Sequence, residues 1–154
     1  MGLAVKKSDF ERGAREALRN SAELIHRTAD AFSNPVAQAA QEMVVRLRKG
    51  GKVICCGNGG SAADAQHIAA ELSGKFYLNR PALPAISITT NPSSVTAISN
   101  DFGYEQVFAK QIEGLGKKGD ILLAFTTSGS SPSTATWRAR ASSSSCSPRP
   151  EPRT

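Results

Sequence analysis

The sequence predicts an α/β protein in which helices flank a doubly wound parallel sheet and N-terminal helices precede it. Short apolar runs alternate with stretches of helical periodicity, which is the order of elements in a parallel α/β sheet. The run at residues 120–125 is apolar after its first residue, as a central strand of such a sheet should be. With 154 residues the chain has room for one domain with its own core.

Composition and charge exclude several classes of protein. No apolar run approaches the length of a membrane span, and the start of the chain leads into a polar helix rather than a signal peptide. The net charge is +6, and the last 18 residues supply +3 of it through four arginines and one glutamate. No basic stripe with interleaved aromatic residues exists, so we expect neither a nucleic-acid nor a membrane partner. The three cysteines form no disulfide framework, which predicts a cytoplasmic location.

Two amphipathic helices are expected before the first strand. Apolar residues recur every three or four positions over 9–32. Asn34 and Pro35 then give the opening of a second helix, which Gly50 and Gly51 end. Together these helices have more apolar surface than one small sheet needs. Either they pack on their own sheet or they join copies of the chain in a homo-oligomer.

The most informative stretch is 53–76, which reads as a strand (53–56), a glycine turn (57–60) and a helix that opens at Ser61. Ser61 is the expected N-cap, and the turn with the first helical turn offers unpaired N–H groups to an anion such as phosphate. His67 and Glu71 stand four residues apart on one helix face. They can share a divalent metal or act as an acid/base pair. A solvent-facing pair is the alternative, and the adjacent anion turn favours a site.

The same turn is also compatible with a dinucleotide-binding site. Residues 57–62 satisfy G-x-G-x-x-G/A between a strand and a helix. That fingerprint also requires a carboxylate at the end of the next strand, which here is expected over 85–89. This strand ends in Thr89, Thr90 and Asn91, so the dinucleotide reading is the weaker one.

The remaining elements lead to a second loop suited to phosphate. Asn91 and Pro92 open a short helix over 93–99, a glycine-containing break holds Asn100 and Asp101, and a further helix covers 105–115. After the third strand, residues 126–132 place five hydroxyls around one glycine. A Ser/Thr-rich turn without a ligand is the alternative. Because ligands bind beyond the carboxyl ends of parallel strands, the two loops predict a pocket of phosphosugar size.

Three motifs carry a resemblance to a known family. They are G-N-G-G-S-A-A-D-A-Q-H-I-A-A-E at 57–71, S-N-D-F-G-Y-E at 99–105 and T-T-S-G-S-S-P at 126–132. They resemble the phosphoheptose isomerases of the sugar isomerase (SIS) fold, and the similarity runs from the N-terminal helices to about Pro132. The resemblance implies a cytoplasmic homotetramer with one zinc ion per subunit. It would convert sedoheptulose 7-phosphate into glycero-manno-heptose 7-phosphate for lipopolysaccharide or related heptose precursors.

The resemblance also implies roles for individual residues. Glu71 would be the catalytic base and, with His67, a zinc ligand. Asp64 either orients a metal ligand or favours the helix N-terminus, and we prefer the second role. His26 is expected to be structural. The substrate-binding residues would be Asn58, Gly59, Gly60, Ser61, Glu71, Asn100, Asp101, Thr126, Thr127, Ser128 and Ser131.

After residue 133 the sequence departs from the family. Residues 134–154 are rich in Ser, Pro and Arg and poor in apolar residues, so we expect a disordered tail. The change suggests a truncation or a reading-frame change. Residues 1–133 would then form a partial SIS domain without the C-terminal part of the fold, and with two of the four family zinc ligands.

Two functions therefore stay open, an isomerase and a non-catalytic SIS module that binds a phosphosugar or a replication-initiator protein. The His67 and Glu71 pair favours the isomerase, because a binding module has no need of it.

Overall fold

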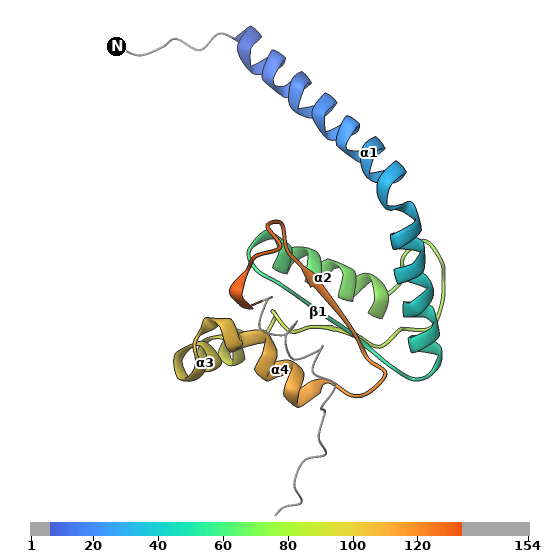
Figure 1. Cartoon of the computed structure of the whole chain (residues 1–154), viewed down its shortest axis with the longest axis vertical. Coiled ribbons are helices and arrows are strands. Elements are labelled where there is room, and N and C mark those ends of the chain that lie inside the picture. Colours follow the sequence, from blue (N-terminus) through green and yellow to red (C-terminus); the bar gives the residue numbers. More distant parts are fainter. Residues whose placement is uncertain (1–6, 134–154) are drawn as a thin grey trace, which may run out of the picture. The chain divides into compact units, whose positions relative to one another are not determined.

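The computed structural model describes residues 7–133 (Figure 1). The predicted tail over 134–154 lies outside the described residues. The chain divides into two compact units after Glu42. The elements are α1 (Lys7–Arg48), β1 (Val53–Gly57), α2 (Gly60–Ser73), β2 (Ala85–Ser87), α3 (Pro92–Phe102), the 3-10 helix η1 (Tyr104–Gln106), α4 (Val107–Leu115) and β3 (Ile121–Phe125).

A parallel sheet forms the centre of the second unit, which confirms the predicted fold class. Within residues 7–133 the strand order is β2-β1-β3. Val53 pairs with Ala85 on one side and with Ile121 on the other. The central strand is thus β1, whose five residues are all buried. The prediction that 120–125 forms a central strand was wrong for this part of the chain, since every residue of β3 is only half-buried at the edge.

Helices cover both faces of the sheet, as expected of a doubly wound fold (Figure 1). Successive residues of β1 point to opposite faces, so Ile54 and Cys56 pack with residues of α3 and α4, including Phe108. Val53 and Cys55 pack on the other face with α2 and with the end of α1. This two-sided burial explains why β1 is an unbroken apolar run.

The two predicted N-terminal helices are one helix, α1, with Pro35 inside it. A proline in a helix removes one backbone hydrogen bond, yet the residues on both sides of Pro35 keep the helical backbone. Just before it, the Ser33 hydroxyl donates to the carbonyl of Ala29, four residues earlier, as helical serines do. The break expected at Asn34 and Pro35 was therefore wrong.

Most of the apolar stripe of α1 is exposed. Leu18 and Ile25 are 72% and 69% exposed, and Phe10 and Phe32 are exposed as well. Near the end of the helix, Met43 and Leu47 pack against the sheet. Of the two explanations for the surplus apolar surface, packing on the chain's own sheet thus applies to the last turns of α1. No helix among residues 7–133 is long and apolar enough to cross a membrane.

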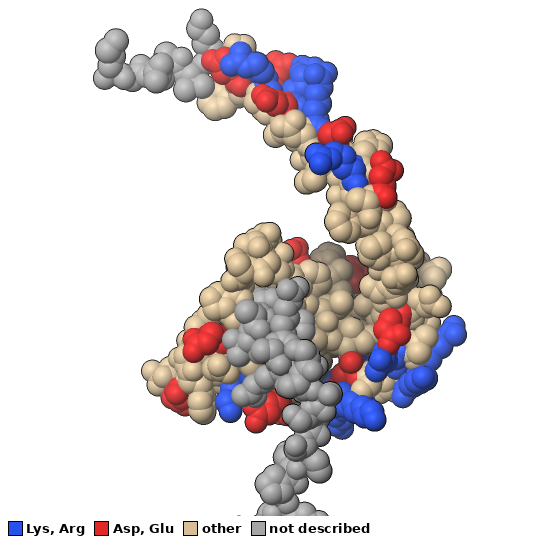
Figure 2. All heavy atoms as spheres, viewed as in Figure 1, with Lys and Arg blue, Asp and Glu red and all other residues tan. Residues whose placement is uncertain are grey.

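An ion pair joins the starts of the two longer strands. Lys52 precedes β1 and Asp120 precedes β3, and the Lys52 ammonium contacts the Asp120 carboxylate. That carboxylate also accepts backbone N–H groups of Lys52 at 3.0 Å and Lys117 at 2.7 Å. Desolvation acts to raise the pKa of Asp120, but these hydrogen bonds and the lysine charge outweigh it and leave the pKa below its usual value. Figure 2 shows Lys and Arg side chains gathered over the end of α1 and the loop that follows it.

Candidate functional site

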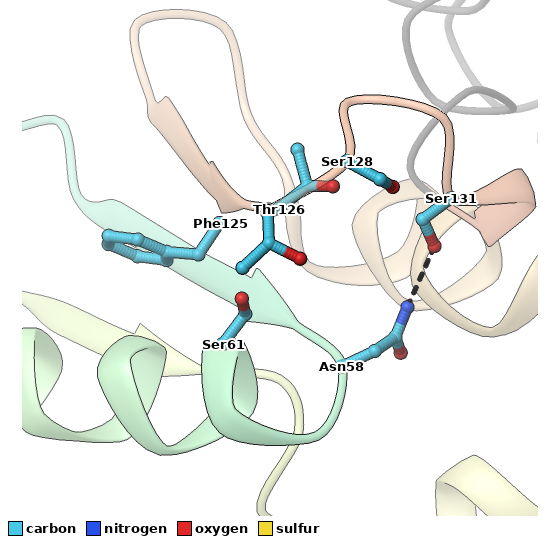
Figure 3. A pocket seen from close by; sticks show the side chains of 7 residues that line it. Asn58, Ser61, Phe125, Thr126, Ser128 and Ser131 are labelled. Atoms are coloured by element: carbon cyan, nitrogen blue, oxygen red, sulfur yellow. Dashed lines mark hydrogen bonds between the residues drawn. The ribbon is translucent and has the colours of Figure 1, made fainter. Parts of the chain in front are cut away.

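A polar cavity of about 210 Å³ lies at the carboxyl ends of β1 and β3 (Figure 3). Two loops form it, the glycine turn before α2 and the segment after β3, as the sequence predicted from the meeting of parallel strand ends. No charged side chain lines it. The lining residues are Asn58, Ser61, Phe125, Thr126, Thr127, Ser128 and Ser131.

The glycine turn is shaped by close backbone packing. A Cβ on Gly57 would lie 2.4 Å from the carbonyl oxygen of Ser61, so only glycine fits there. Gly59 has a φ of 56° and is the N-cap of α2. The prediction that Ser61 caps the helix was wrong, because α2 begins at Gly60 and Ser61 already lies in its first turn.

The first turn of α2 uses part of its N–H groups internally. Ser61 N–H donates to the Asn58 carbonyl at 3.0 Å, and Ala62 N–H donates to the Gly59 carbonyl at 3.1 Å. Within the described residues the N–H groups of Gly59 and Gly60 have no such partner. An anion at this helix start would therefore meet those two N–H groups together with the Ser61 hydroxyl.

The segment after β3 is held by its own hydroxyls. Thr126 Oγ1 accepts the N–H of Gly129 at 3.1 Å, and Ser128 Oγ accepts the N–H of Ser130 at 3.3 Å. Gly129 has a φ of 69°, a conformation that favours glycine. The loop therefore presents hydroxyl groups to the cavity from a backbone that is already folded around them.

Asn58 links the two loops of the cavity. Its Nδ2 donates to Ser131 Oγ and to Ser133 Oγ, both at 2.9 Å, and Figure 3 shows Asn58 and Ser131 reaching toward each other. Tyr104, in η1, donates its hydroxyl to Asn58 Oδ1 at 2.8 Å. Sequence reasoning assigned no role to Tyr104 or Ser133. Their position in or beside the quoted motifs was the one available signal.

His67 and Glu71 lie on one face of α2, as the spacing predicted. Their Nε2 and Oε1 atoms are 3.5 Å apart, and their side chains are 71% and 32% exposed. Two ligands of a tetrahedral zinc ion with bonds of about 2.1 Å lie about 3.4 Å from each other, so the pair fits two corners of such a site. No group of three or more potential ligands exists within residues 7–133. Neither residue lines the cavity.

The sequence predicted that Asn100 and Asp101 lie in a glycine-containing break after a helix, and this was wrong. They lie in the last turn of α3, which continues to Phe102 before Gly103 ends it with a φ of 86°. The Asn100 amide donates to the Asp101 carboxylate at 2.9 Å. Both are exposed, and neither lines the cavity.

The end of β2 explains why a dinucleotide site is the weaker reading. The strand is shorter than predicted and stops at Ser87. The Ser87 hydroxyl lies 2.8 Å from that of Thr89, and the Thr90 hydroxyl donates to the Ser87 carbonyl at 2.9 Å. These hydroxyls occupy the place where the fingerprint requires a ribose-binding carboxylate.

Comparison with known proteins agrees with this geometry. The model of the SIS domain matches residues 18–144. The phosphoheptose isomerase of Roseiflexus sp. is 48% identical over 124 residues, which are 80% of this chain and 63% of that protein. The chain spans about half the length of other curated relatives, such as the phosphoheptose isomerase of Azoarcus sp., which is 54% identical over 99 residues.

A solved structure gives the same result. The phosphoheptose isomerase from Neisseria gonorrhoeae superposes with a TM-score of 0.80 at 37% identity, over 87% of this chain and 70% of that one. The family match covers residues 18–144, which include both loops of the cavity. The chain belongs to the SIS domain family, among the phosphoheptose isomerases.

Proposed function

We propose that this protein is a sugar phosphate isomerase that interconverts sedoheptulose 7-phosphate and glycero-manno-heptose 7-phosphate. Such a reaction would supply heptose precursors, including those of lipopolysaccharide. The observation that carries the proposal is the polar cavity at the ends of β1 and β3, which is lined mainly by hydroxyl side chains and by no carboxylate. The names of the relatives support the same reaction class.

The cavity would hold the phosphate end of the substrate. A phosphate monoester has only acceptors in its dianionic form, and hydroxyls with helix N-terminal N–H groups are donors suited to it. In the proposal Ser61, Thr126 to Ser128 and Ser131 bind the phosphate and its nearest oxygens. Asn58, Gly59 and Gly60 shape the turn and contact the sugar, and Asn100 with Asp101 contacts its far hydroxyls.

Glu71 would carry the proton transfer. Ketose–aldose isomerisation moves a proton between two adjacent carbons through an enediol, and a carboxylate can accept that proton and return it to the neighbouring carbon. Glu71 is the half-exposed carboxylate of α2 and has an imidazole 3.5 Å away. Binding of the remote phosphate would fix the position of the reacting carbons, which raises the rate of the transfer.

His67 and Glu71 would also hold a zinc ion. Their separation fits two of its ligands. When bound, zinc would supply polarisation of the substrate's carbonyl oxygen. We further propose that the protein works as a homo-oligomer, a tetramer by analogy with its family, in the cytoplasm. The exposed stripe of α1 and the two free, buried cysteines support these two points.

The test is turnover of sedoheptulose 7-phosphate by the purified chain, with and without added zinc. We expect aldose formation in the presence of zinc, and loss of at least two orders of magnitude in kcat for Glu71→Gln, because a general base of this kind contributes about 10²–10⁴-fold. Glu23→Gln, on the exposed part of α1, is the matched control and should retain activity. A folded chain that does not turn over the substrate, or an active Glu71→Gln variant, contradicts the proposal.

A second function is kept because no third potential ligand joins His67 and Glu71 within residues 7–133. In this alternative the chain is a non-catalytic module that binds a phosphosugar or a replication-initiator protein. Calorimetry separates the two functions. Sugar phosphate binding without turnover, unaffected by zinc or by Glu71→Gln, supports the module.

A further inference from the structure

We infer that Tyr104 is a positioning residue of the phosphate site. Through Asn58, it sets the direction of a chain of hydrogen bonds that leaves the Ser131 hydroxyl as a donor to the ligand. This inference rests on the proposed function, because it concerns how the same cavity binds a phosphate. It adds two residues that sequence reasoning had not assigned, Tyr104 and Ser133.

The first step is the orientation of the Asn58 amide. A side-chain amide has an acceptor end and a donor end. Tyr104 donates its hydroxyl to Oδ1 at 2.8 Å, so the oxygen faces η1 and the NH₂ group faces the loop after β3. There Nδ2 has two protons and two partners, Ser131 Oγ and Ser133 Oγ, each at 2.9 Å. All of the amide's donors are therefore used inside the protein.

The second step is the direction of the two serine hydroxyls. Each accepts a proton of Asn58, so each keeps its own O–H proton for another partner. Ser133 is 1% exposed, and its oxygen lies 3.2 Å from that of Ser131. A buried hydroxyl proton needs an acceptor, and within the described residues Ser131 Oγ is the one available. We therefore assign Ser133 as the donor and Ser131 as the acceptor of this pair, in which either oxygen can donate.

The third step is the consequence for the ligand. Ser131 Oγ accepts from both Asn58 and Ser133, so its own proton is directed away from them. Ser131 lines the cavity, and its proton therefore points to the ligand. A phosphate dianion, which has acceptors only, matches this donor, whereas an ammonium or another ligand group that must donate does not. These hydrogen bonds also connect three segments that are distant in the sequence.

The alternative is that the hydrogen bond between Tyr104 and Asn58 only links the loops, and this alternative makes a different prediction. Loss of a bond that only links the loops would lower the stability of the protein. Loss of a bond that orients Asn58 would also change the proton exchange of its amide and the affinity for phosphate. Tyr104→Phe removes the hydroxyl and keeps the ring. Tyr77→Phe is the matched control, because Tyr77 is 92% exposed and its ring contact with Phe76 is kept in phenylalanine.

The first readout needs no ligand. In the full chain labelled with 15N-asparagine, the Asn58 side-chain NH₂ signals are assigned by their disappearance in Asn58→Asp. We expect slow proton exchange of this NH₂ in the wild type and in Tyr77→Phe. In Tyr104→Phe we expect exchange at least about fivefold faster, which corresponds to the loss of one hydrogen bond of ordinary strength. Ser133→Ala should also speed exchange, since it removes one of the two acceptors.

The second readout is ligand binding, measured by calorimetry with inorganic phosphate and with sedoheptulose 7-phosphate. Tyr104→Phe should weaken both by about fivefold. In turnover it should raise KM and leave kcat nearly unchanged, as expected when uniform binding of a remote group is lost. Tyr77→Phe should change none of these quantities.

The outcomes separate the inference from the proposed function. Unchanged NH₂ exchange and unchanged phosphate affinity in Tyr104→Phe overturn the inference. The proposed function is unaffected by that result as long as the wild-type chain binds sugar phosphates. A wild type with no affinity for sugar phosphates overturns the proposed function. In that case faster NH₂ exchange in Tyr104→Phe still supports the positioning of Asn58 by Tyr104, and unchanged exchange overturns it.

Discussion

At the scale of single residues, Asp120 holds the starts of β1 and β3 together. Its carboxylate is 10% exposed and meets the Lys52 ammonium and two backbone N–H groups. Asp120→Asn removes the charge and leaves Lys52 without its partner. We expect a loss of about 2 kcal/mol in the free energy of unfolding, typical of hydrogen bonds to a charged group, measured by urea denaturation at neutral pH. The control variant Asp30→Asn, on the exposed part of α1, should leave the free energy of unfolding unchanged.

The same residue gives a dependence of stability on pH. The pKa of Asp120 is lower in the folded chain than its ordinary value of about 3.9, so the folded state binds fewer protons. Its contribution is therefore complete above the unfolded pKa and is lost as pH falls through the folded one. Wild type and Asp120→Asn should thus converge in stability as pH falls below the ordinary aspartate pKa of about 3.9. A difference that stays constant from neutral pH to acid would contradict the role of the charge.

The two cysteines of β1 should be unreactive in the folded protein. Burial raises the pKa of Cys55 to about 11, and burial together with the neighbouring Cys55 raises that of Cys56 to about 12. Thiolates, which carry the reactivity, are then scarce at neutral pH. In a Cys146→Ser chain we expect no rapid reaction with a disulfide reagent until urea unfolds it, and then reaction of two thiols. Fast labelling of the native chain would contradict the buried position of β1.

At the scale of elements, the turn between β1 and α2 depends on one glycine. A Cβ on Gly57 would lie 2.4 Å from the Ser61 carbonyl oxygen, which belongs to the backbone and cannot move alone. Gly57→Ala should cost about 1–3 kcal/mol, as overpacking does, and should weaken phosphate binding because Ser61 is displaced. Thermal unfolding and calorimetry measure the two effects. Gly114→Ala, in α4 and away from the cavity, is the control, since nothing lies within 4 Å of its added Cβ; equal losses in both variants would exclude the steric explanation.

Local patterns predicted some elements better than others. β1 and its turn were predicted almost to the residue, because a buried apolar strand followed by glycines leaves few alternatives. The Asn91 cap was also confirmed, since its side chain accepts the N–H of Ser94 at 3.1 Å. The split of α1 failed at Pro35, a residue equally compatible with a helix start and with a helix that loses one bond.

At the scale of the whole molecule, the sequence predicted the cavity because parallel strand ends meet at one edge of a sheet. It placed Asn58, Ser61 and the hydroxyls after β3 together, and the structure agrees. Tyr104 escaped prediction because its bond to Asn58 spans 46 residues. No periodicity or spacing reports such a contact, which depends on how α3 and η1 pack beside the sheet.

Assembly is the last property that belongs to the whole molecule. Leu18, Ile25 and Phe32 recur every seven residues on α1, so they share one face of the helix, and all three are exposed. A row of large apolar side chains of this length is typical of a surface that a second helix covers. We therefore expect the wild-type chain to form a homo-oligomer in which this face is buried.

An aspartate on that face should dissociate the oligomer. Ile25→Asp would bury a charge in an apolar interface, which costs far more than one side chain contributes there, so sedimentation should show smaller species at micromolar concentration. Asn20→Asp adds the same charge on the other side of α1, about 140° away from Ile25 at 100° per residue, and should leave the mass unchanged. A monomeric wild type would contradict the oligomer, and an oligomer that survives Ile25→Asp would place the contact elsewhere on the molecule.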